Sequence, residues 1–191
     1  VLMRPCCFCY ELDDGVALGS ILWGLFSVNF VRADLRQALR LSEELEDLMH
    51  RRSEPLLQLQ AHHASGGTLF SLGRFEESLR HFEQGIALYT RDQHGTQLSQ
   101  CGVDLGVFCH AWSAHPLWHL GFPERALQRS REANRLAESL GHPFSQALAM
   151  AYAAMLAQFS GESTLTWESA QATIEFCAQN DIVYYNDWAG I

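Results

Sequence analysis

The stretch from Ala61 to Tyr89, which reads AHHASGGTLFSLGRFEESLRHFEQGIALY, decides the fold. Two apolar patterns with helical spacing meet in it at a short turn, LGRF at 72–75. Forty-eight residues after this turn, the run LGFPERAL at 120–127 again separates two helical patterns. Each copy is typical of a helical hairpin, which cannot bury its apolar face without a neighbour. The sequence therefore predicts a stack of hairpins.

The turn positions recur at regular spacing along the whole chain. They are Ala33, Gly73, Gly121 and Gly161, separated by 40, 48 and 40 residues. Small side chains allow two helices to approach closely, because nothing bulky separates the backbones. Such residues lie seven positions before three of the turns and five positions after three of them: Gly66, Ala114 and Ala154, and Ala38, Ser78 and Ala126. Two independent columns of small residues strengthen the prediction of a repeat.

We expect an all-α fold, a right-handed α-solenoid of about four antiparallel helical hairpins, over residues 15–191. Residues 1–14 show no periodicity and are predicted to be an irregular lead. The polar run at 90–102 is predicted to be a longer loop. The hairpins are expected at about 16–51, 55–90, 103–140 and 143–180, with the start of a fifth at 183–191.

Composition restricts the possible partners and location. The 191 residues carry a net charge of −9, which disfavours a nucleic-acid surface because such a surface needs clustered basic residues. No apolar run reaches about 18 residues, so we expect no transmembrane helix. The first residues do not have the apolar core of a signal peptide, and the six cysteines are expected to be reduced thiols. We therefore expect a cytoplasmic protein without membrane partners.

The ends of the chain suggest a longer protein. The sequence opens on Val1 rather than Met and stops at Ile191, inside an apolar segment that would begin a new helix. We expect this chain to be a fragment.

The repeat pattern resembles a known family. In this pattern a small residue is followed seven positions later by a turn Gly, and five positions after that by Ala or Ser. Together with aromatic residues at Phe75 and Phe82, the pattern resembles tetratricopeptide repeats lengthened to about 40 residues. More closely, the runs GVDLGV, LWHLGFPERAL and LGHPFS within 100–146 resemble the helical-repeat part of bacterial ATPase regulators. In those proteins the repeats follow an AAA-like nucleotide-binding domain, often behind a class III adenylate or guanylate cyclase domain. The resemblance covers roughly 16–191 and implies a sensor or protein-binding portion rather than the ATPase or the cyclase.

Motifs for nucleotide or structural zinc binding are incomplete. The run GVALGS at 15–20 has no Lys to reach a phosphate, so we do not expect a phosphate loop there. A single C-x2-C spacing occurs among Cys6, Cys7 and Cys9, but no second pair follows at the spacing that a tetrahedral zinc site requires. We expect no bound cofactor and no metal.

Two further residue pairs are candidate chemical sites. His115 and His119 share a helix face, as metal ligands would, but no Glu completes an H-E-x-x-H motif, and a structural or groove-lining pair is favoured. Cys109 and His110 are adjacent on a helix and point about 100° apart, so they are not arranged as nucleophile and base. Cys109 and Cys177 are predicted to be small core residues. We expect no enzyme activity from this chain.

Recognition is the remaining function, and the tetratricopeptide-like register predicts where it occurs. The first helices of stacked hairpins line the concave face, which would bind a peptide, a protein or a neighbouring domain of the same chain. The residues that this register places toward the groove are Trp23, Phe30, His63, Phe70, Phe108, His115, Trp118 and His119. Phe30, Phe70 and Trp118 occupy equivalent positions of three repeats, either as a binding stripe or as packing between repeats. The alternative function is the sensing of a small apolar effector near His115 and Trp118.

Overall fold

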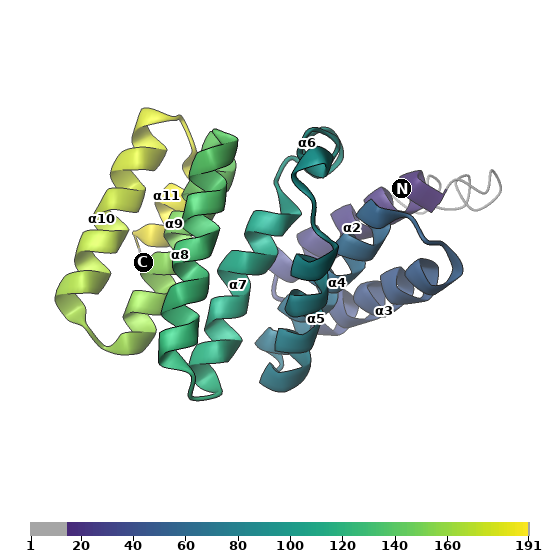
Figure 1. Ribbon diagram of the computed structural model, residues 1–191, viewed down its shortest axis with the longest axis horizontal. Helices are drawn as coiled ribbons and strands as arrows, with labels where there is room; N and C mark the ends of the chain where they lie inside the picture. Colours follow the sequence, from purple (N-terminus) through teal and green to yellow (C-terminus); the bar gives the residue numbers. More distant parts are fainter. Residues whose placement is uncertain (1–14, 191) are drawn as a thin grey trace. The chain divides into compact units, whose positions relative to one another are not determined.

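The computed structural model describes residues 15–190, and the elements formed there are helices without strands (Figure 1). The all-α fold class is therefore confirmed, while the predicted irregular lead at 1–14 lies outside the described residues. The helices are α2 Gly15–Val31, α3 Leu35–Arg51, α4 Pro55–Ser71, α5 Phe75–Leu88, α6 His94–Cys101, α7 Leu105–His119, α8 Pro123–Leu140, α9 Pro143–Ser160, α10 Ser163–Gln179 and α11 Val183–Ala189, with a 3-10 helix η1 at Arg91–Gln93.

The chain forms two compact units, Val1–Gly106 and Val107–Ile191. In the first unit, α2 packs against α3, α3 against α4, and α4 against α5 and α2. In the second unit, α9 packs against α8, α10 and α11. Neighbours in sequence are thus neighbours in space, as the hairpin pattern predicts.

The four predicted turn positions share a left-handed backbone conformation. Ala33, Gly73, Gly121 and Gly161 have φ angles of 59°, 76°, 86° and 74°. Glycine adopts this conformation without steric cost, which explains its recurrence at three of the four turns. The turn after α4 is closed by hydrogen bonds from the Gly73 amide to the Phe70 carbonyl and from the Arg74 amide to the Leu69 carbonyl, both 2.9 Å. The turn register is therefore confirmed.

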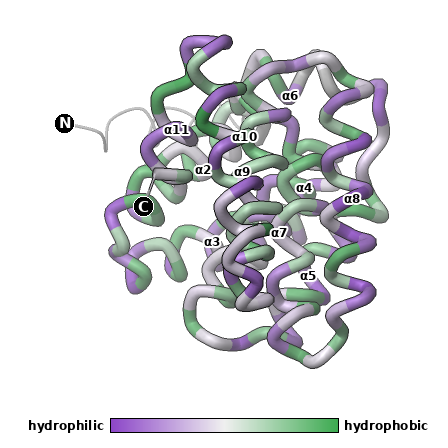
Figure 2. Tube along the Cα trace, turned by 90° about the vertical axis from the view of Figure 1, so that its left-hand side faces the viewer, coloured by the Kyte–Doolittle hydropathy of each residue, from purple (hydrophilic) through white to green (hydrophobic). Residues whose placement is uncertain are grey.

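Sequence signals also set the helix boundaries and faces. Asp34 caps α3 by accepting a hydrogen bond of 3.1 Å from the Gln37 amide, and α4, α8 and α9 each begin on proline. Hydrophilic and hydrophobic residues alternate along α5 and α8 (Figure 2), as on helices with one solvated face. By contrast, most of α4 is buried, from Leu59 through Leu69. No described helix has the length and apolarity needed to cross a membrane.

The two columns of small residues lie inside the helix packing. All six members are buried: Gly66, Ala114, Ala154, Ala38, Ser78 and Ala126. On α4, a Cβ atom added to Gly66 would lie only 2.6 Å from the ring of Phe82 on α5. The Ser78 hydroxyl donates a hydrogen bond of 2.7 Å to the Gly66 carbonyl. The small residues therefore allow the close approach of α4 and α5 that their pattern predicted.

The predicted loop at 90–102 was wrong in part, because this stretch contains η1 and α6. Two side chains of this stretch, Gln97 and Cys101, bond to other parts of the unit. The Gln97 side chain is buried and accepts a hydrogen bond of 2.7 Å from the Leu105 amide. The Gln60 amide group donates to the Cys101 sulfur at 3.3 Å, which joins α4 to the end of α6. The surrounding unit thus supplies partners for Gln97 and Cys101 that the local pattern could not show.

A matched pair of glycine substitutions tests the close approach. Gly66→Ala is expected to lower the free energy of unfolding by about 1–3 kcal/mol, because the new methyl group overlaps the fully buried Phe82 ring. Gly24→Ala, where nothing lies within 4 Å of the new Cβ, is expected to raise it by up to ~1 kcal/mol through helix propensity. Urea unfolding measures both, and equal effects of the two substitutions would contradict this packing.

The alanine in the first turn provides a second test. Ala33 has a left-handed φ of 59°, a conformation that costs L-residues about 1–2 kcal/mol. Ala33→Gly is therefore expected to raise the free energy of unfolding by about 0.5–1 kcal/mol, since part of the gain is lost to the greater freedom of unfolded glycine. Thermal and urea unfolding measure this gain, and a destabilised variant would show that the turn is not left-handed.

Candidate functional site

The predicted groove residues of the first unit pair with one another between α2 and α4. The Trp23 indole donates a hydrogen bond of 3.1 Å to His63 Nδ1, and the two ring centroids are 5.7 Å apart. Phe26 meets His63 edge-on, with centroids 6.0 Å apart. Trp23 and His63 are both buried, so they join two helices and present little surface to a partner.

Phe30 and Phe70 lie near the ends of their helices and are half-buried. Phe30 contacts Phe26 at a centroid distance of 5.6 Å, and Phe70 contacts Phe75 across the turn at 5.5 Å. Trp118 is also half-buried but belongs to the second unit. The proposed binding stripe of Phe30, Phe70 and Trp118 therefore stays a prediction.

In the second unit, Tyr152 on α9 is the centre of an aromatic cluster. The His115 ring stacks on it with centroids 5.2 Å apart and planes 14° apart, and His115 Nε2 donates a hydrogen bond of 3.0 Å to the Tyr152 carbonyl. Phe108 and Trp112 meet the Tyr152 ring edge-on, at 5.6 and 5.5 Å. His115 is fully buried, and Trp188 of α11 also contacts Tyr152, at 5.1 Å. The structure thus brings two of the predicted residues, Phe108 and His115, to one tyrosine.

The sequence interpretation overlooked Trp112 and Tyr152, although their positions carry a signal. Each lies nine residues before a turn glycine, Gly121 or Gly161, so they are equivalent in two repeats. Their aromatic rings pack against each other with a centroid distance of 5.5 Å. His119 lies apart from this pair: it is exposed and contacts Phe159, with centroids 4.9 Å apart.

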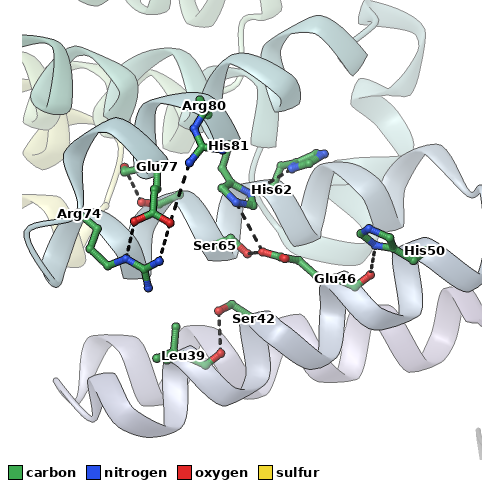
Figure 3. A network of polar contacts seen from close by, with 12 residues as sticks. Leu39, Ser42, Glu46, His50, His62, Ser65, Arg74, Glu77, Arg80 and His81 are labelled. Carbon is green, nitrogen blue, oxygen red and sulfur yellow. Dashed lines mark hydrogen bonds and ion pairs between the residues drawn. The ribbon is translucent and has the colours of Figure 1, made fainter.

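A polar network connects three helices of the first unit (Figure 3). The Ser65 hydroxyl of α4 donates a hydrogen bond to the Glu46 carboxylate of α3. His81 of α5 lies with its Nε2 3.7 Å from Glu46 Oε1 and its Nδ1 3.3 Å from Nδ1 of His62 on α4. His50 bonds through its Nδ1 to the Glu46 carbonyl at 2.7 Å. The network therefore joins α3, α4 and α5 through one carboxylate.

Burial disfavours the charged forms of His62 and His81. The pKa of His62 is lowered to about 4, mainly by burial and further by the neighbouring His81, while Glu46 opposes the shift. Burial also lowers the pKa of His81, again against the effect of Glu46. With Nε2 of His81 turned to the carboxylate, its Nδ1 is left to accept the proton of His62 Nδ1. The pair is thus a neutral link between helices.

The arrangement does not form a hydrolytic triad. In such a triad a histidine accepts the proton of the serine, whereas the Ser65 hydroxyl donates to Glu46. Among the side chains that the structure describes, no group of three or more His, Cys, Asp or Glu is arranged to hold a metal ion. Cys109 and Cys177 are fully buried, which confirms their predicted place in the core.

Comparison with known proteins adds no family assignment. No protein-family model matches the sequence, and no curated protein matches it significantly.

The buried histidines make stability depend on pH. The pKa of His63 is lowered by burial from 6.5 to about 3. Below pH 6.5 the unfolded chain takes up a proton that the folded chain excludes until near pH 3, so stability is complete at neutral pH and falls on acidification. The loss is expected to reach about 1.4 kcal/mol per pH unit for this group. His63→Asn retains an acceptor for Trp23 but does not titrate, so its free energy of unfolding should fall less steeply with pH.

Urea unfolding of both proteins at a series of pH values from neutral to about 4 measures these slopes. Identical slopes for the two proteins would contradict a buried neutral His63.

Proposed function

We propose that this chain is a non-catalytic protein-recognition module. In this proposal it is a right-handed solenoid of about four helical hairpins within a larger bacterial signalling ATPase or cyclase-like regulator. It binds a partner protein, or a neighbouring domain of the same protein, and so couples that contact to nucleotide turnover elsewhere.

The observation that carries this proposal is the position of the exposed large apolar side chains. Most of them lie within six residues of a turn between the first and second helix of a pair. These turn-edge residues are between 39% and 67% exposed, and they are Val28, Val31, Leu72, Phe122, Leu127, Leu165 and Trp167. Scattered apolar residues are ordinary on a protein surface, whereas a recurring apolar edge is typical of an interaction site.

The chain reverses at every turn, which brings alternate turns to the same end of each unit. In the second unit, the α7–α8 and α9–α10 turns both lie at the lower edge of Figure 1. Phe122 and Trp167, near these two turns, are 46% and 67% exposed. Tryptophan and other aromatic residues supply much of the energy at protein interfaces, because they remove large apolar areas from water with little loss of conformational freedom. An exposed Trp in an otherwise well-packed unit therefore supports a recognition role.

The proposed function is tested by removing the apolar edge without disturbing the core. A triple variant, Leu72→Ser, Phe122→Ser and Trp167→Ser, changes only exposed residues, so its melting temperature should stay close to that of the wild type. As bait in a lysate of the source organism, the wild type is expected to retain a specific protein that the triple variant loses. The loss should be about tenfold or more, since interface aromatics commonly contribute over 1 kcal/mol.

The matched control replaces the exposed residues at the start of α11, Val183→Ser with Tyr184→Ser, and should retain the same protein. If the triple variant binds the same proteins as the wild type, or the wild type binds none, the turn edge is not a recognition surface.

A further inference from the structure

Two outer helices of the second unit carry equivalent faces with different chemistry. Helices α8 and α10 both pack against α9, and each follows a left-handed glycine, Gly121 or Gly161. Residues separated by 40 positions are therefore equivalent on the two helices. Their buried positions agree with this register, since Ala133 corresponds to Thr173 and Ala137 to Cys177, all of them buried.

The solvated face of α8 combines an apolar residue with two arginines. Leu127, Arg131 and Arg135 follow one another at intervals of four residues, so they form a single stripe. All three are exposed. Arg129, on another side of the helix, pairs with Glu132 at 3.4 Å. Among the described residues, neither Arg131 nor Arg135 has such an ion-pair partner.

The equivalent stripe on α10 is apolar and acidic. Trp167 corresponds to Leu127, and Glu175 corresponds to Arg135. Glu168, next to Trp167 in sequence, is also exposed. Gln171, which corresponds to Arg131, donates a side-chain hydrogen bond of 3.0 Å to Glu175. Every charged residue after Arg135 is acidic, so no basic side chain of α9, α10 or α11 offsets these carboxylates.

The geometry points to a second copy of this chain as a partner: we propose that α8 of one copy packs beside α10 of another. Both helices run upward from the turns at the lower edge of Figure 1, so a two-fold axis along this direction would place equivalent residues at the same height. Leu127 then meets Trp167, and Arg135 meets Glu175. The acidic residues at the ends of the α8 stripe, Glu124 and Glu138, meet the uncharged Thr164 and Ala178.

Symmetry strengthens this contact. In a two-fold dimer, the α8 face of each copy meets the α10 face of the other, so the same pairing forms twice and doubles the buried area. Stable interfaces generally bury more than about 1,000 Å² in total, which a single helix crossing does not readily supply. This inference rests on the proposed recognition role, since the dimer contact includes two turn-edge residues, Leu127 and Trp167. Their partner would be a second copy of the chain.

Charge reversal tests the dimer directly. Sedimentation velocity over a concentration series is expected to show a reversible monomer–dimer equilibrium for the wild type. Two variants should each weaken it by about tenfold or more, because like charges then face each other. The first is Arg131→Glu with Arg135→Glu, which makes both stripes acidic. The second is Glu168→Arg with Glu175→Arg, which makes both stripes basic.

Mixing the two variants provides the decisive measurement. An acidic copy and a basic copy should form a heterodimer, because each α8 stripe then faces an α10 stripe of opposite charge. Arg36→Glu with Arg40→Glu makes the same charge change on exposed positions of α3 and should leave dimerisation unchanged. Melting curves of all variants check that each remains folded.

A wild type that stays monomeric at every concentration would overturn this inference. So would a dimer that both charge reversals leave intact, or variants that do not pair when mixed. The dimer experiments do not involve the turn-edge residues Leu72 and Phe122, so the proposed recognition function is tested separately by the triple variant. A wild type that neither dimerises nor retains a specific protein would refute the two proposals together.

Discussion

The close approach of α4 and α5 is the contact on which the first unit depends. Gly66 leaves room for the fully buried Phe82 ring, and Ser78 satisfies the Gly66 carbonyl with a hydrogen bond. A larger residue at either position would separate the backbones and open a gap around Phe82, which dense protein interiors do not tolerate cheaply. The small residues at the equivalent positions are also buried in the second unit, as Ala114, Ala154 and Ala126.

Close packing of this kind brings polar side chains into the interior, where they need partners. The first unit meets this need with histidines: His63 accepts from Trp23, and His62 and His81 share a network with Glu46. A neutral imidazole can donate through one nitrogen and accept through the other, so it can join two helices without burying a charge. Burial disfavours the protonated forms of His62 and His63, so their pKa values are lowered.

These histidines form hydrogen bonds within the unit, so the features available for recognition are those of the outer surface. Apolar side chains recur near the turns, and the stripes of α8 and α10 differ chiefly in charge. A repeat architecture favours such divergence, because its core positions are constrained by packing while its equivalent surface positions are free to change. The position of Leu127 and Trp167 is apolar in both helices. The position of Arg135 and Glu175 is basic in α8 and acidic in α10.

The sequence by itself determined the all-α class, the turn positions and the columns of small residues, because each depends on local chemistry: helical periodicity, left-handed turns and the absence of a large side chain. Only the tertiary structure decided which polar and aromatic residues are buried. Trp23, His63 and His115 were predicted to line a groove, yet they pack inside the units. The polar stretch at 90–102 was predicted as a loop, yet it contains α6. Burial and hydrogen-bond partners come from residues distant in sequence, so no local pattern encodes them.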